Sequence, residues 1–150
     1  MEAHLLLADS AQRDSVTGKV HILGGGWNLI TGPAASMAVV VFLRAGWDEL
    51  TDGEHAVMVR LLDKDGRPAM TPGLGDDKPI EAAGKITLVS PDAESDPVGR
   101  ELGFETSFAV NVVAPLQPGH RYRWILELDG KELADVAFGV RAVAVPDARS

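Results

Sequence analysis

The chain has 150 residues, of which 45% are hydrophobic and 24% charged, a composition typical of one globular domain that buries roughly 70% of its unfolded surface. It contains no cysteine, which excludes disulfides, cysteine-ligated zinc, iron–sulfur clusters and thiolate catalysis. Its formal net charge of −8 disfavours binding to nucleic acid and to anionic membranes, because an acidic surface repels phosphate groups.

The opening residues lack the positively charged start and the apolar stretch of about 7–15 residues that a signal peptide needs. The longest apolar run, Met37–Leu43, is far shorter than the ~20 residues of a membrane-spanning helix. We therefore expect a cytoplasmic protein with a single domain over residues 1–150. The tail at 146–150 is expected to fray.

Three strands are predicted in the first third of the chain, at 3–8, 20–23 and 38–43. The third is apolar without alternation and rich in valine, which is typical of a central strand covered on both faces. Before it, the glycine run 24–26 precedes Trp27. We interpret this run as a bulge or sheet crossing that places Trp27 in the core, and the alternative is a bare backbone that approaches a ligand closely.

A short helical turn is predicted at Trp47–Leu50, because the acidic residues 48 and 49 suit a helix N-terminus. The next strand, Val57–Leu62, ends in the turn Asp63–Gly66. That turn has the spacing of an incipient calcium loop, but its twelfth residue is Leu74 instead of the required glutamate. A turn at a strand end is the better interpretation.

Two segments rich in proline, glycine and acidic residues, Met70–Lys78 and Ser90–Gly103, are predicted to be exposed loops. A strand is expected between them, in the region Ile86–Val89. After them, the strand Phe104–Val112 alternates apolar and polar side chains.

The clearest alternation lies in His120–Asp129, where one face carries Tyr122, Trp124, Leu126 and Leu128. The next strand carries Val136 and Phe138 on one face. A plain two-residue turn at Asp129-Gly130 would place these two residues on the wrong side of the hairpin. The sequence therefore predicts that Trp124 pairs with Val136, through either a three-residue loop at 129–131 or a bulge near Ala134–Asp135.

About eight short strands, separated by turn signals, predict an all-β fold. We expect a two-sheet antiparallel β-sandwich, Ig-like or jelly-roll-like, and the alternative is a closed barrel. The nine prolines support these assignments, since all lie between or at the ends of the apolar runs and proline cannot donate to a sheet ladder.

No catalytic motif surrounds the four histidines, which are His4, His21, His55 and His120. We therefore expect no enzyme activity, no catalytic residue, no metal site and no cofactor. The candidate binding residues are instead the corner formed by Gly25, Gly26 and Trp27 together with Trp47, where exposed tryptophans would stack on a sugar or a partner.

Several segments together resemble a bacterial family known only as a domain of unknown function and made of short acidic proteins. The segments are Glu2–Asp9, Gly18-Lys19, Ile22–Trp27, Trp47-Asp48, Leu62-Asp63, Asp65-Gly66, Tyr122–Trp124, Leu126–Gly130 and Phe138–Arg141. The resemblance covers nearly the whole chain. It implies a soluble bacterial protein with a compact β fold and brings no catalytic residues with it.

The leading hypothesis is a non-catalytic interaction module that binds another protein or copies of itself. It rests on the lack of catalytic motifs, on the exposed strand edges that sandwiches use for pairing, and on the apolar strand 38–43, which needs cover on both faces. The alternative is a small-ligand or carbohydrate-binding sandwich that uses the corner Gly25–Trp27 with Trp47. A hydrolase or transferase ranks third.

Overall fold

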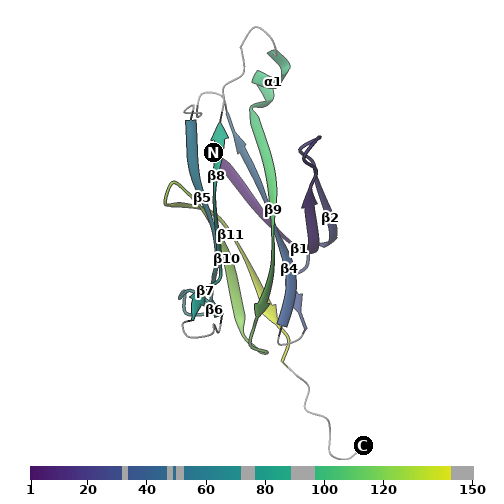
Figure 1. Ribbon diagram of the computed structural model, residues 1–150, viewed down its shortest axis with the longest axis vertical. Helices are drawn as coiled ribbons and strands as arrows, with labels where there is room; N and C mark the ends of the chain where they lie inside the picture. The colour runs from purple at the N-terminus through teal and green to yellow at the C-terminus, as the bar shows by residue number, and fades with distance from the viewer. Residues whose placement is uncertain (32–33, 47–48, 50–52, 72–76, 89–96, 143–150) are drawn as a thin grey trace, which may run out of the picture.

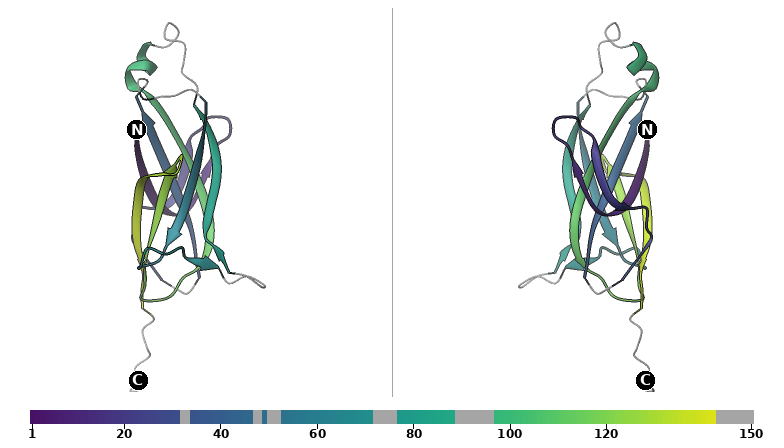
Figure 2. Two further views of the ribbon diagram at one scale, coloured as in Figure 1. Left: turned by 90° about the vertical axis from the view of Figure 1, so that its left-hand side faces the viewer. Right: turned by 90° about the vertical axis from the view of Figure 1, so that its right-hand side faces the viewer.

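The computed structural model describes residues 1–31, 34–46, 49, 53–71, 77–88 and 97–142. Within them two β-sheets pack face to face as a sandwich (Figures 1 and 2). The elements are β1 (Glu2–Arg13), β2 (Val20–Gly25), β3 (Leu29–Ile30), β4 (Ala34–Ala45), β5 (Gly53–Leu62), β6 (Met70–Thr71), β7 (Lys78–Pro79), β8 (Glu81–Leu88), α1 (Pro97–Leu102), β9 (Phe104–Pro115), β10 (Arg121–Leu128) and β11 (Lys131–Val140).

One sheet has four strands in the order β2-β1-β4-β9, and the other has five in the order β3-β11-β10-β5-β8. The strands β6 and β7 form a separate small hairpin at the end of the sandwich opposite α1 (Figure 1). The predicted all-β sandwich is confirmed. All neighbouring strands pair antiparallel except β3, which runs parallel to β11.

The core lies between the sheets, and the inward face of β10 is its centre. The four residues predicted to share that face are all buried there: Tyr122, Trp124, Leu126 and Leu128. Trp124 is fully buried, and its indole Nε1 donates a hydrogen bond to Met37 Sδ of the opposite sheet at 3.4 Å. This contact satisfies a polar group that would otherwise be costly to bury.

The β10–β11 hairpin has the register that the sequence predicted. Trp124 lies opposite Val136, and Tyr122 lies opposite Phe138. The turn itself has two residues, Asp129 and Gly130, with φ of 50° and 82°. A bulge at Leu133, beside the predicted position, restores the inward facing of β11. The bulge was one of the two predicted solutions, and the three-residue loop does not form.

The valine-rich strand β4 is covered on both faces, as predicted. Its inward side chains join the main core, while Ala38 and Val40 lie on the outer face in a second buried cluster with Ala8 and Ala11. The cover on the outer face is the hairpin of β1 and β2, because β1 leaves β4 after Ala8 and continues as the partner of β2 (Figure 2, right).

The glycine run marks the point where the chain crosses between sheets. Gly24 has φ +62°, and a Cβ there would overlap the Asp9 carboxylate, so the position requires glycine. The strand β2 before the run belongs to the four-stranded sheet, and β3 after it belongs to the five-stranded sheet. Trp27 packs edge-on against Phe138 with ring centroids 6.0 Å apart. The predicted sheet crossing is confirmed.

Four local expectations have other outcomes. The segment Met70–Lys78, predicted to be an exposed loop, begins with the short strand β6 and ends at the start of β7, which pair with each other. The helix α1, Pro97–Leu102, lies inside a segment predicted to be loop, because a helix of six residues is too short to show periodicity in the sequence. The predicted helical turn at Trp47–Leu50 lies outside the described residues except for Glu49, and the tail 146–150 lies wholly outside them. Among the described residues, no helix has the length and apolar character needed to span a membrane.

Candidate functional site

A cleft of about 410 Å³ opens between the two sheets along one side of the sandwich. Its walls are the edge strands β8 and β9, which belong to different sheets, and the buried side chains Val57 and Val59 of β5 also line it. Most of the lining is apolar, and the volume lies within the roughly 300–1,000 Å³ range of ligand pockets.

The cleft exists because β8 carries small side chains at its inward positions. The pairing of β8 with β5 places Gly84 opposite Val57 and Ala82 opposite Val59, so both face the interior of the sandwich. A Cβ built on Gly84 would meet no heavy atom within 4 Å. The edge strand therefore leaves empty the space that a larger side chain would fill.

The opposite wall shows the consequence in its burial. The inward side chains of Phe108 and Val110 on β9 are only half-buried. Their cross-strand neighbours on the same face of β4, Val41 and Val39, are both 0% exposed. The two rows of side chains lie on neighbouring strands of one sheet. The incomplete burial of the row on β9 therefore reflects the missing cover beside β8.

Two cations stand at the rim of this otherwise apolar cleft. Arg13 lies at the end of β1, and its Nε donates to the Ser107 carbonyl at 3.1 Å. No carboxylate of the described residues lies within 4.0 Å of its guanidinium. Lys85 is an exposed residue of β8, with its Nζ 3.4 Å from Glu54. Arg13 thus gives the rim a positive charge that no carboxylate of the described residues offsets, in a protein whose net charge is −8.

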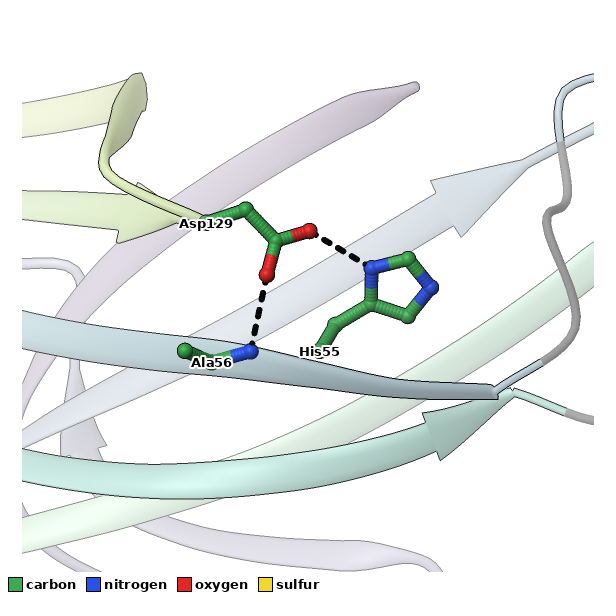
Figure 3. Close-up of polar contacts among 3 residues, drawn as sticks. All are labelled: His55, Ala56 and Asp129. Atoms are coloured by element: carbon green, nitrogen blue, oxygen red, sulfur yellow. Dashed lines mark hydrogen bonds and ion pairs between the residues drawn. The ribbon is translucent and has the colours of Figure 1, made fainter.

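A second polar cluster joins β5 to the turn of the β10–β11 hairpin (Figure 3). His55 Nδ1 lies 2.7 Å from Asp129 Oδ2, and Asp129 Oδ1 accepts the Ala56 backbone N–H at 2.9 Å. The Asp129 backbone N–H in turn donates to the Ala56 carbonyl at 2.8 Å. One carboxylate therefore fixes both an imidazole and the end of a strand.

These contacts tie β5 to the hairpin turn, and we refer to His55, Ala56 and Asp129 together as the latch. The hydrogen bond from His55, followed by the one from the Ala56 N–H, holds the pKa of Asp129 below its usual range. A histidine oriented by a carboxylate is also part of hydrolytic sites, which further need a nucleophile and a pocket beside the imidazole. Neither side chain of the pair lines the cleft.

Neighbouring residues lie close to the binding corner predicted from the sequence, unlike around an open surface on which a ring would stack. A Cβ on Gly25 would lie 2.9 Å from Ile22, and the Gly26 N–H donates to the Leu7 carbonyl at 2.8 Å. Trp27 is half-buried, and its Nε1 is buried without a hydrogen-bond partner among the described residues. Trp47, the fourth candidate, lies outside the described residues, so binding at this corner stays a prediction.

The carboxylate of Asp63 holds the acidic turn after β5. Asp63 Oδ1 accepts the backbone N–H groups of Asp65 and Arg67 at 2.9 and 3.0 Å, which closes the predicted turn at the end of β5. No three His, Asp or Glu side chains of the described part of the chain gather in a group that could hold a metal ion.

Sequence reasoning missed both the cleft and the latch. The cleft depends on strand order, because β8 and β9 line it only as edge strands on the same side of the sandwich. The latch joins residues 74 positions apart. The signal available in the sequence was the pair of small residues Ala82 and Gly84 at alternate positions before Ile86, which leave an inward row with little volume.

Comparison with solved structures finds distant similarities to short stretches of large enzymes. A member of glycosyl hydrolase family 2 from Bacteroides cellulosilyticus matches with a TM-score of 0.44 and 18% identity over 74% of this chain and 13% of that one. A β-glucosidase from Listeria innocua in complex with gluconolactone matches with a TM-score of 0.42 and 11% identity over 96% and 16% of the two chains. The chain thus spans less than a fifth of these proteins, and the TM-scores are too low to support an inference.

A search of curated protein sequences finds no match. A family profile, in contrast, covers residues 3–141, from the first strand to the residue after β11. This span includes both walls of the cleft, the latch and the sheet crossing. The chain therefore belongs to DUF6941, a family of unknown function.

Proposed function

We propose that the chain is a non-catalytic interaction module that binds a partner protein in the cleft between β8 and β9. The observation that carries the proposal is the half-burial of Phe108 and Val110 opposite the empty inward position at Gly84. Apolar surface of this kind is stabilised by about 25 cal/mol for each Å² that a partner removes from water. We further propose that the protein is bacterial and works in the cytoplasm, as expected from the sequence.

The strand β4 does not add to this argument. Its apolar outer face needs cover, and the β1–β2 hairpin of the same chain supplies it through Ala8 and Ala11. Inward-facing Leu5 and Val136 are also partly exposed, but the half-buried Phe108 and Val110 differ from them in lining an open cleft. The proposal therefore names one binding site and not a non-specific association through the sheets.

Binding of an anionic aromatic dye tests the site. Anilinonaphthalene sulfonate combines an apolar ring system with one negative charge, which suits the apolar lining and the cation at Arg13. We expect saturable binding to the folded protein and a loss of binding in Gly84→Leu, whose side chain would fill the cleft. The matched control is Ala137→Leu, on the exposed outer face of β11 and away from the cleft lining, which keeps the binding.

Two results would contradict the proposal. One is the absence of dye binding to the native protein, and the other is equal binding by Gly84→Leu and the wild type. Circular dichroism of each variant shows whether its fold is retained, so that a loss of binding is assigned to the cleft.

A second candidate function is the binding of a small apolar ligand at the same place. The volume of about 410 Å³ favours it, since this suits a compact organic molecule as well as part of a peptide. Thermal-shift screening separates the two, because a small ligand at a hundred times its Kd would add about 2.7 kcal/mol to the stability.

A further inference from the structure

We propose that the occupant of the cleft is an extended peptide segment of another protein, which adds as a strand to the edge of β8 and places alternate apolar side chains between the sheets. The inference rests on the proposed function, because it specifies the mode and the chemistry of binding at the same site. Four features carry it: the edge of β8, the state of the β9 edge, the dimensions of the cleft, and its charge.

The edge of β8 offers hydrogen bonds along the whole cleft. On one side β8 pairs with β5, and on the other it pairs with no described strand. In an antiparallel ladder, alternate residues of an edge strand direct their N–H and C=O groups outward. An added strand pairs with these groups and gains affinity from its main chain, whereas an apolar molecule in the cleft would leave them to water.

The edge of β9 is less available to a strand. Arg13 already donates to the Ser107 carbonyl, in the middle of the part of β9 that lines the cleft. The side chain of Lys85 on β8 instead points to solvent, where Glu54 is its partner. A strand that enters the cleft therefore has its backbone partners on β8 and contacts β9 through side chains.

The dimensions of the cleft suit an extended chain. The lining on β8 runs continuously from Ala82 to Thr87, which at ~3.4 Å per residue is about 17 Å. A strand of that length directs about three side chains to one face. The space that these side chains enter lies above Ala82 and Gly84, and apolar side chains of β9, Phe108 and Val110, form its far wall.

The charge of the rim favours acidic flanks on the peptide. Arg13 has no carboxylate partner among the described residues, and Lys85 shares its charge with Glu54. A segment with apolar residues in the centre and carboxylates at its ends would therefore match the cleft. Rim charges of this kind act on the association rate and its salt dependence more than on the final affinity.

A second copy of this chain is a poorer occupant. If two β8 strands paired about a two-fold axis, each would offer the other its own small side chains, Ala82 and Gly84, which cannot fill the cleft. Such a pair would also bring two Lys85 side chains into the same stretch of edge, where like charges repel. The occupant is therefore a different protein.

The test uses the full chain and a defined probe, the peptide acetyl-Glu-Val-Thr-Val-Thr-Val-Glu-amide. Its valines share one face and its threonines share the other, so residues of one type direct their N–H groups to one side of the strand. One variant carries N-methyl groups on all valines, and the other carries them on both threonines. Calorimetry measures the affinity of the three peptides for the protein.

We expect the unmodified peptide to bind and only one of the two methylated peptides to lose affinity, by at least about tenfold, because only one set of N–H groups faces β8. The sensitive set also reveals whether the added strand is parallel or antiparallel. Equal affinities of the two methylated peptides, whether high or low, would overturn strand addition.

The failure of this inference is distinguishable from a failure of the proposed function. If the peptide does not bind but the dye still binds in a Gly84-dependent way, the cleft is a binding site and the strand mode is wrong. If neither binds, both are wrong. Reversal of the rim charge in Arg13→Glu should slow peptide association at low salt, while the same change at the exposed Arg121, outside the cleft lining, should not. Equal effects of the two variants on the association rate would contradict the role of the rim.

Discussion

The side-chain amide of Asn111 on β9 bonds both backbone groups of Ala11 on β1, one hundred residues earlier in the chain. Asn111 Nδ2 donates to the Ala11 carbonyl at 2.9 Å, and Asn111 Oδ1 accepts the Ala11 N–H at 3.3 Å. The amide thus replaces a neighbouring strand at the point where β1 has left β4. It ties the β1–β2 hairpin to the outer face of the sheet.

Removal of this amide should loosen the hairpin. We expect Asn111→Ala to lower the free energy of unfolding by about 1–2 kcal/mol, since two hydrogen bonds to a partly buried backbone are lost. Urea unfolding measures the change. The matched control is Glu105→Ala on the outer face of the same strand, which loses only an exposed ion pair of 3.5 Å with Arg44 and should cost less than about 0.5 kcal/mol. Equal losses would show that the amide has no special role.

Filling the cleft should stabilise the chain while it blocks the site. Gly84 has open space around its inward position, and a valine there also suits a strand better than glycine, so we expect Gly84→Val to gain about 1 kcal/mol. Gly25→Val is the comparison, because its Cβ would lie 2.9 Å from Ile22 and should destabilise. Thermal unfolding shows whether each variant is stabilised or destabilised. Destabilisation by Gly84→Val would mean that the cleft is closed in the folded protein.

The latch makes part of the stability dependent on pH. The pKa of Asp129 is lowered in the folded chain, first by the hydrogen bond with His55 and then by the one with the Ala56 N–H. A depressed carboxyl pKa contributes stability above the unfolded value of about 3.9, and this contribution is lost as the pH falls through the folded value. We therefore expect Asp129→Asn to be less stable than wild type at pH ~7, with the difference shrinking below pH ~4.

Urea unfolding at several pH values tests this dependence. Asparagine tolerates the positive φ of the turn, so the backbone of the variant is retained. The control is Asp65→Asn in the turn after β5, whose side chain makes no hydrogen bond with the described residues and which should leave the pH profile unchanged. A difference between Asp129→Asn and wild type that is as large at pH ~3 as at pH ~7 would refute the latch.

The sequence predicted those parts of the fold that depend on local patterns. Alternation identified the core face of β10, and the position of Val136 and Phe138 after a two-residue turn required the bulge found at Leu133. The unbroken apolar run of β4 correctly indicated cover on both faces, although a partner was one expected source of it. The β1–β2 hairpin supplies that cover because β1 changes partners at Ala8.

The cleft could not be predicted from the sequence, for a physical reason. The residues Glu81–Gly84 have low strand propensity, and pairing with β5 extends the strand five residues ahead of the predicted start at Ile86. The same small residues create the cleft, but only when β8 and β9 are edge strands. Which strands lie at the edges is set by long-range pairing, and no local pattern records it.

The reactivity of a single cysteine at position 84 shows whether the cleft is open and whether the peptide enters it, because the chain has no other thiol. We expect Gly84→Cys to react with iodoacetamide about as fast as Ala137→Cys on the exposed outer face of β11, and the valine–threonine peptide to slow only the former. A rate as slow as that of Ala38→Cys, at a fully buried position, would contradict this expectation, and so would a rate that the bound peptide leaves unchanged.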